Sequence, residues 1–195
     1  MDRALFVALR YSVQTGHSIL YDQQTKVQWS KYVWERCTIP KHRYILWLAM
    51  QQRLRTRVYL SRFWHEMDKL CLLCGDHNED ISHLFFQCTY SNQCLKKMKD
   101  WLGCRAQTED FYKLLQWFSK VKYFSKLRKK FCIATVTALV YHLWRVQNDA
   151  LWSCKIWQVN HTLEGIKTEM KMRLTVLLYK GKKDRDNDWI QKLYS

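Results

Sequence analysis

Apolar residues recur at helical spacing over most of the chain, and the longest such stretch runs from about Phe124 to Met170. Within it, residues 131–148 place their apolar side chains along one stripe, which is typical of a helix packed into a core. The stripe consists of Cys132, Val136, Leu139, Val140, Leu143 and Val146. We therefore expect a long helical region that contains a buried helix.

Residues 29–64 also carry a helical pattern, but Pro40 interrupts it. Because proline lacks the backbone N–H that a helix interior needs, the pattern predicts one helix before Pro40 and another after it. Thr56 is a candidate N-cap for a further short helix. Residues 71–80 are interpreted as a loop, and residues 81–88 as a short helix that carries His83.

Two more helices are predicted on either side of residue 105. One begins at Ser91 and ends at Gly103, since glycine suits the left-handed position after a helix, and the other spans 110–121. The charged stretch 180–188 is interpreted as a loop or disordered connector before a last short helix.

The composition also favours long helices over a strand-and-turn architecture. The 195 residues include only one proline and five glycines, whereas sheets need frequent turns. Hydrophobic residues make up 48%, with ten tryptophans and eleven tyrosines, which indicates a globular chain. No run of eighteen apolar residues is present, so we predict no membrane-spanning segment.

The net charge of +16 is unevenly distributed. Residues 1–60 hold ten Lys/Arg against three Asp/Glu, residues 61–110 hold six against eight, and residues 111–195 hold seventeen against six. Two basic flanks favour an anionic partner, of which RNA or DNA is the commonest. The alternatives are a solvated basic surface and a surface that binds an acidic protein.

The stretch "CLLCGDHNEDISHLFFQC" (71–88) has the spacing C-x2-C-x8-H-x4-C. Zinc takes four sulfur or nitrogen ligands, and its sites often begin with such a close cysteine pair. Cys71, Cys74, His83 and Cys88 would fill the shell and leave no position for a reactive water, so the expected Zn²⁺ is structural. His77 and Cys94 are rival ligands, and the simpler alternative is a set of core cysteines with a surface histidine.

The cysteine pattern bears on the compartment as well. The N-terminus has no apolar signal segment, because Arg3 and Arg10 interrupt it, and three of the eight cysteines fall in one short stretch. We therefore expect an intracellular, reducing compartment and a metal site rather than disulfides. Nucleus and organelle, such as the mitochondrion, both stay open.

These patterns predict a mainly α fold, a helical domain with a small CCHC zinc-knuckle-like loop. We expect residues 1–104 to form a helical zinc-binding domain with its zinc loop at 71–88. A helical C-terminal part, 105–179, would pack on it, and residues 180–195 would form a charged tail.

At residues 71–88 the chain resembles the reverse-transcriptase zinc-binding domain family, which is found at the C-terminus of plant LINE-type non-LTR retroelement polyproteins. The similarity covers most of residues 9–150 and includes "RYSVQTGHSIL", "WSKYVWERCTIPKHRYILWLAMQQRLRTRVYL" and "VYHLWRVQN". It implies that Cys71, Cys74, His83 and Cys88 bind zinc. The chain departs from the family pattern at Leu72, Cys94 and Gln147, the last of which replaces the arginine of an Arg-Asn pair.

The resemblance implies a role in helping a polymerase to hold its template RNA or target DNA. The polymerase that precedes this region in the polyproteins has no counterpart here, so we expect a retroelement fragment or a host protein derived from one. We expect no enzyme, because neither a phosphate loop nor a nucleophile motif is present. A solvated acidic face explains the carboxylates near the zinc loop, which are Glu66, Asp68, Asp76, Glu79 and Asp80.

Two basic clusters are candidates for phosphate contact. The first comprises Lys41, Arg43, Arg53, Arg55 and Arg57, and the second Lys126, Arg128, Lys129 and Lys130. Aromatic residues lie among them and would stack on unpaired bases if exposed. We expect Trp34, Trp47 and Trp144 to be core residues, whereas Tyr59, Trp64 and Tyr123 stay open.

The leading hypothesis is a non-catalytic, zinc-stabilised protein that binds RNA or DNA and contacts RNA in a ribonucleoprotein, with protein neighbours. A structural subunit of an organellar ribosome and a protein–protein adaptor are the alternatives. No membrane partner and no small-molecule substrate are expected.

Overall fold

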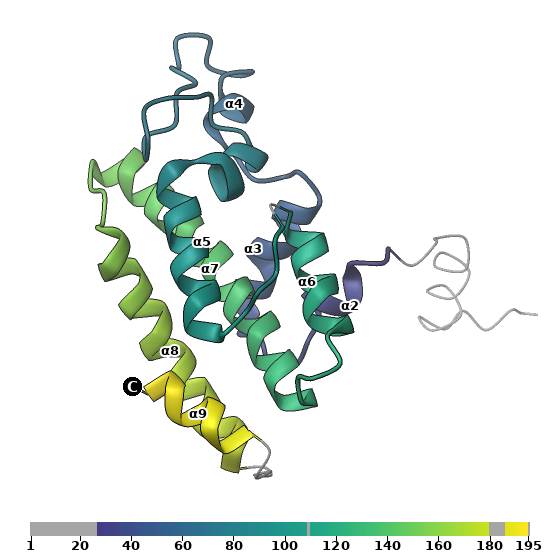
Figure 1. The fold of residues 1–195 in the computed structure, drawn as a ribbon. Helices are drawn as coiled ribbons and strands as arrows, with labels where there is room; N and C mark the ends of the chain where they lie inside the picture. The colour runs from purple at the N-terminus through teal and green to yellow at the C-terminus, as the bar shows by residue number, and fades with distance from the viewer. Residues whose placement is uncertain (1–26, 109, 180–185, 195) are drawn as a thin grey trace, which may run out of the picture. The chain divides into compact units, whose positions relative to one another are not determined.

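Helices make up the regular structure of the part of the chain that the computed structural model describes, residues 27–108, 110–179 and 186–194 (Figure 1). Within these ranges the only β feature is an isolated antiparallel bridge between Leu70 and Asn78. The mainly α prediction is confirmed. The helices are α2 (Ser30–Val33), α3 (Pro40–Met50), α4 (Arg57–Leu60), η1 (His83–Gln87), α5 (Thr89–Leu102), α6 (Phe111–Lys120), α7 (Lys126–Ser153), α8 (Val159–Tyr179) and α9 (Asn187–Tyr194).

Helix α7 is the centre of the core in the compact unit formed by Lys31–Ser195. Helices α3, α5, α6 and α8 and the η1 turn all pack against it. Every residue from Phe131 to Val140 is buried, and the predicted apolar stripe is buried throughout. The hydroxyls of Thr135 and Thr137 donate to the carbonyls of Phe131 and Ile133 four residues earlier, which satisfies both polar groups inside the core.

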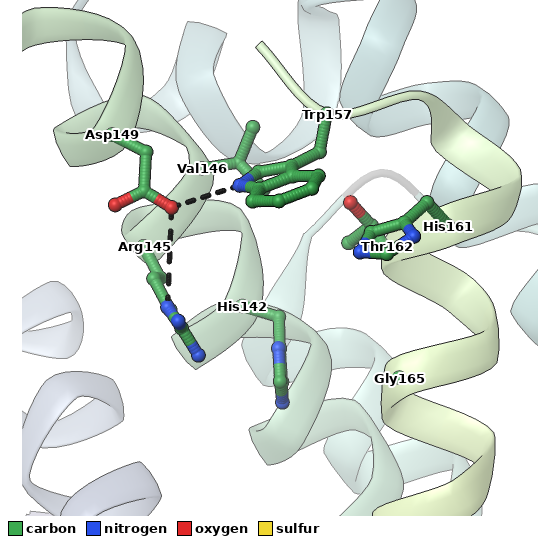
Figure 2. Close-up of a pocket in the computed structure, with 8 residues that line it drawn as sticks. All are labelled: His142, Arg145, Val146, Asp149, Trp157, His161, Thr162 and Gly165. Atoms are coloured by element: carbon green, nitrogen blue, oxygen red, sulfur yellow. Dashed lines mark hydrogen bonds and ion pairs between the residues drawn. The ribbon is translucent and has the colours of Figure 1, made fainter. Parts of the chain in front are cut away.

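The long helical region predicted from Phe124 to Met170 contains α7 and the first part of α8. α7 ends at Ser153, and Cys154 takes a left-handed conformation with φ of +50° before α8 begins at Val159. The indole N–H of Trp157 donates to the carboxylate of Asp149 across the turn, at 3.0 Å (Figure 2). Residues 153–158 contain neither glycine nor proline. The sequence pattern therefore gave no signal for the end of α7.

Other helix ends follow the predicted chemistry. Pro40 opens α3, the Thr56 hydroxyl accepts from the N–H of Tyr59 at the start of α4, and Gly103 ends α5 with φ of +64°. α5 begins two residues before the predicted Ser91, because Cys88 is its N-cap.

Trp34 is not a core residue as predicted, since 57% of its surface is exposed, whereas Trp47 and Trp144 are half-buried. The motif at 10–20 and residues 180–185 of the charged tail lie outside the described residues, while α9 is the expected last short helix. The domain division at residue 104 stays a prediction. None of the described helices is long and apolar enough to cross a membrane.

Candidate metal centre

Cys71 and Cys74 lie in a short hairpin. The N–H of Glu79 donates to the carbonyl of Lys69, and that of Cys71 donates to the carbonyl of His77, both at 2.8 Å. The N–H of Gly75 closes a turn onto the carbonyl of Cys71 at 2.8 Å, and Gly75 has φ of +74°, which glycine adopts at little cost. The turn therefore brings both thiols to the same side of the backbone.

His83 and Cys88 reach that point through a π turn. The N–H of Cys88 donates to the carbonyl of His83, five residues earlier, at 2.8 Å. An α-helical turn closes after four residues, so the wider turn is what aligns side chains that are five apart. The carboxylate of Asp80 accepts from the N–H of His83 at 2.7 Å and fixes the start of this turn.

The four ligand atoms form one cluster, in which all of them lie within 4.8 Å of one another. The sulfurs of Cys71 and Cys88 are 3.9 Å apart, and the Cys74 sulfur is 3.3 Å from Nε2 of His83. Zn–S bonds of about 2.3 Å and Zn–N bonds of about 2.0 Å in a tetrahedron give ligand separations of roughly 3.5–3.8 Å. The donor set and its spacing therefore fit a zinc ion.

The electrostatics of the cluster favour thiolate at Cys88. The contact with Cys71, together with the N–H groups of Ser91 and Tyr90 at the start of α5, lowers the pKa of Cys88 to about 5. The same sulfur contact, with burial, raises the pKa of Cys71. The sulfur contact therefore favours one thiolate in the pair, and the thiolate is the form that binds metal.

Glu79 joins the hairpin to two helices. Its Oε1 accepts from the N–H of Arg57 at the start of α4, at 3.1 Å, and from the side-chain amide of Gln147 in α7, at 2.9 Å. Its own backbone carbonyl accepts from the N–H of Val58 at 3.1 Å. Glu79 and Gln147 are fully buried, so the metal loop is fixed to the core through a polar contact.

The rival ligands lie outside the cluster. His77 is exposed and only its ring faces that of His83, at 5.6 Å between centroids. Cys94 is buried on α5, and burial raises the pKa of its thiol to about 12, which disfavours the metal-binding form. The four ligands named from the spacing are the ones that the fold gathers.

Residues 11–94 match a family model described as zinc-binding in reverse transcriptase. This segment is therefore similar to the zinc-binding region of reverse transcriptases. The match includes all four residues of the cluster. The family description and the geometry of the cluster therefore both indicate zinc as the bound metal. No curated protein and no solved structure matches the chain.

Within the first predicted basic cluster, the residues have different environments. Arg53 and Arg55 are exposed, and Lys41 is exposed but lies 3.7 Å from a carboxylate oxygen of Glu169. Arg57 is only 7% exposed, and its Nε donates to the backbone carbonyl of Asp68 at 2.7 Å. Arg43 is half-buried. Arg57 therefore holds the zinc loop and is not available to a phosphate.

The second predicted cluster mostly serves helix ends. Arg128 lies over the ring of Phe124 at 3.7 Å and donates to the carbonyls of Leu102 and Gly103, which end α5. Lys129 donates to the carbonyl of Ser119 near the end of α6, and Lys130 lies 3.3 Å from Glu35. Lys126 is exposed. We therefore leave Arg128 and Lys129 out of a nucleic-acid surface.

A groove between α3, α4 and the end of α7 was not predicted from the sequence. It has a volume of about 650 Å³, within the usual 300–1,000 Å³ of ligand sites. We call it the aromatic groove, and its lining includes Tyr44, Arg53, Arg55, Tyr59, Trp64, Trp144, Asn148 and Trp152. Trp64 is 52% and Trp152 67% exposed. The sequence left open whether Trp64 is a core residue, and the structure shows that it is exposed. Trp152 is 88 residues from Trp64 in sequence, which is why the pattern alone could not join them.

Proposed function

We propose that this protein is a non-catalytic, zinc-stabilised nucleic-acid-binding protein that contacts RNA as a subunit of a ribonucleoprotein. The observation that carries the proposal is the aromatic groove, where two exposed arginines lie among exposed aromatic rings. The family of residues 11–94 supports nucleic-acid contact. The net charge of +16 favours a polyanion.

The chemistry of the groove suits a single strand better than a duplex. Tryptophan and tyrosine faces stack on bases only when those bases are unpaired, at about 1–3 kcal/mol for each base. Arg53 and Arg55 would contact the phosphates, and Asn148 offers an amide to a base edge. These groups together favour unpaired RNA or DNA.

The metal supports this surface and takes no part in a reaction. Three sulfurs and one nitrogen saturate a tetrahedral ion, which leaves no position for an activated water. Through Glu79 and Arg57, the zinc loop holds the start of α4, and α4 carries Tyr59 into the groove. The zinc is thus expected to shape the binding surface.

Fluorescence anisotropy with a labelled single-stranded RNA tests the proposal. Replacing Arg53 and Arg55 by alanine should weaken binding at least tenfold, and so should replacing Trp64 and Trp152 by alanine. The matched control removes Lys96 and Lys120, two exposed charges on α5 and α6 outside the groove, and should change affinity little.

Equal losses in the groove and control variants would contradict a defined site and indicate diffuse charge attraction. No RNA or DNA binding by the zinc-loaded chain would contradict the proposal altogether. A protein adaptor would then be favoured, because exposed tryptophans also anchor protein partners. An organellar ribosome subunit remains one form of the ribonucleoprotein role, and recovery of ribosomal RNA with the native protein would select it.

A further inference from the structure

Three side chains from three helices converge at a second point, away from the cysteine cluster. They are His42 on α3, His142 on α7 and Glu169 on α8, and their ligand atoms lie within 4.8 Å of one another. Nε2 of His142 is 2.8 Å from one carboxylate oxygen of Glu169, and Nε2 of His42 is 3.5 Å from the other. The two imidazoles therefore face the same carboxylate.

His42 is unusual within this group. Its side chain is fully buried, yet neither ring nitrogen has a hydrogen-bond partner. Burying a polar group in this way is costly, and most buried polar groups avoid it. A cation held by the lone pair of Nε2 and by Glu169 would give that nitrogen a partner and reduce the cost.

We propose that His42, His142 and Glu169 form a second metal site, which binds a divalent transition-metal ion of the zinc type. Two imidazole nitrogens and one carboxylate are a common ligand set for such ions, and they leave one position for water or for a partner's side chain. Bonds of about 2.0–2.1 Å in a tetrahedron imply ligand separations of roughly 3.3 Å. The observed 2.8 Å and 3.5 Å lie on either side of that value.

The site is open enough for an ion to enter. Glu169 keeps 22% and His142 16% of its side chain exposed. His142 also lines a pocket between α7 and α8, where Figure 2 shows it beside Arg145 and opposite His161. An ion bound here would tie α3, α7 and α8 together.

Lys41 is the natural competitor of the ion. Its ammonium lies 3.7 Å from the Glu169 oxygen nearest to His42, and 55% of its side chain is exposed. The side chain can therefore turn toward solvent when a cation arrives. Removing this charge should strengthen metal binding, whereas a merely structural role for Lys41 would give no such gain.

Zinc stoichiometry tests the site in the full chain. After equilibrium dialysis against buffered free zinc, elemental analysis should find two ions for each wild-type chain and one for His142→Gln or Glu169→Gln. The matched control His161→Gln alters an exposed histidine of the neighbouring pocket and should keep both ions. Lys41→Gln should bind the second ion at least several-fold more tightly.

Cobalt(II) distinguishes the two centres, because only the cysteine cluster can give intense thiolate-to-metal absorption. A second equivalent of cobalt should add weak visible bands alone, and these should be missing in the His142→Gln variant. Circular dichroism checks that each variant keeps its helices. If His142→Gln fails to fold, the cobalt titration of Glu169→Gln tests the same site. One zinc ion per wild-type chain, or a second ion retained by both variants, would overturn the proposal.

Discussion

At the scale of single residues, Glu79 controls how the zinc loop meets the core. Burial raises the pKa of Glu79 to about 7, although the N–H and charge of Arg57 and the amide of Gln147 oppose the shift. Gln147 donates its neutral side-chain amide to this carboxyl, so the contact brings no positive charge. Burial outweighs these contacts and favours the protonated form of the carboxyl.

Replacing Glu79 by glutamine should therefore flatten the pH dependence of stability. Because the folded-state pKa of about 7 exceeds the ordinary 4.5, the folded chain holds the proton more tightly, and the free energy of unfolding falls as pH rises between these values. The variant lacks this slope, since an amide stays neutral. Thermal melts of zinc-saturated protein across that window measure it.

Glu66→Gln is the control for that experiment, because Glu66 is exposed near the same loop. It should keep the wild-type slope. If the free energy of unfolding of the Glu79→Gln variant kept the wild-type slope against pH, another group would cause the pH dependence.

At the scale of elements, the hairpin around Cys71 and the π turn from His83 to Cys88 depend on the metal. Their few backbone hydrogen bonds close short turns, and metal binding at such sites contributes on the order of 10 kcal/mol to folding. Chelation, or the Cys71→Ser and Cys74→Ser double change, should release zinc and expose amides 69–88 to hydrogen exchange, while α7 stays protected.

The exposed Cys154 supplies the control for zinc loss, since Cys154→Ser should keep full zinc content. Amides 69–88 that remain protected after chelation would contradict the assigned role of the metal.

The turn between α7 and α8 makes a separate prediction. Cys154 has φ of +50°, where a side chain is strained and glycine is not. Cys154→Gly should stabilise the chain by up to about 1 kcal/mol, because relief of this strain outweighs the added freedom of the unfolded state. Denaturant unfolding measures the change, and Cys154→Ala, which keeps the Cβ, should bring no such gain.

At the scale of the whole molecule, the charge distribution predicts a steep salt dependence of RNA affinity. The logarithm of the association constant should fall linearly with the logarithm of salt concentration, with a slope of about −0.7 for each phosphate neutralised on a single strand. Binding that hardly changes with salt would instead indicate contact through the apolar rings. Anisotropy titrations over a range of salt concentrations measure the slope.

The sequence by itself identified the four residues of the cysteine–histidine cluster, the helical class and several helix ends. The reason is that these features depend on local chemistry: cysteines in a short turn, Thr56 as a cap, Pro40 at a helix start and Gly103 at a helix end. The π turn at His83 was beyond prediction in detail, but its five-residue spacing was already visible.

Only the tertiary structure decided which basic and aromatic residues are free. Arg57 and Arg128 look like phosphate ligands in the sequence, yet both bind backbone carbonyls outside their own helices. The aromatic groove and the group of His42, His142 and Glu169 likewise join helices far apart in sequence. Such sites arise from helix packing, which a local pattern does not encode.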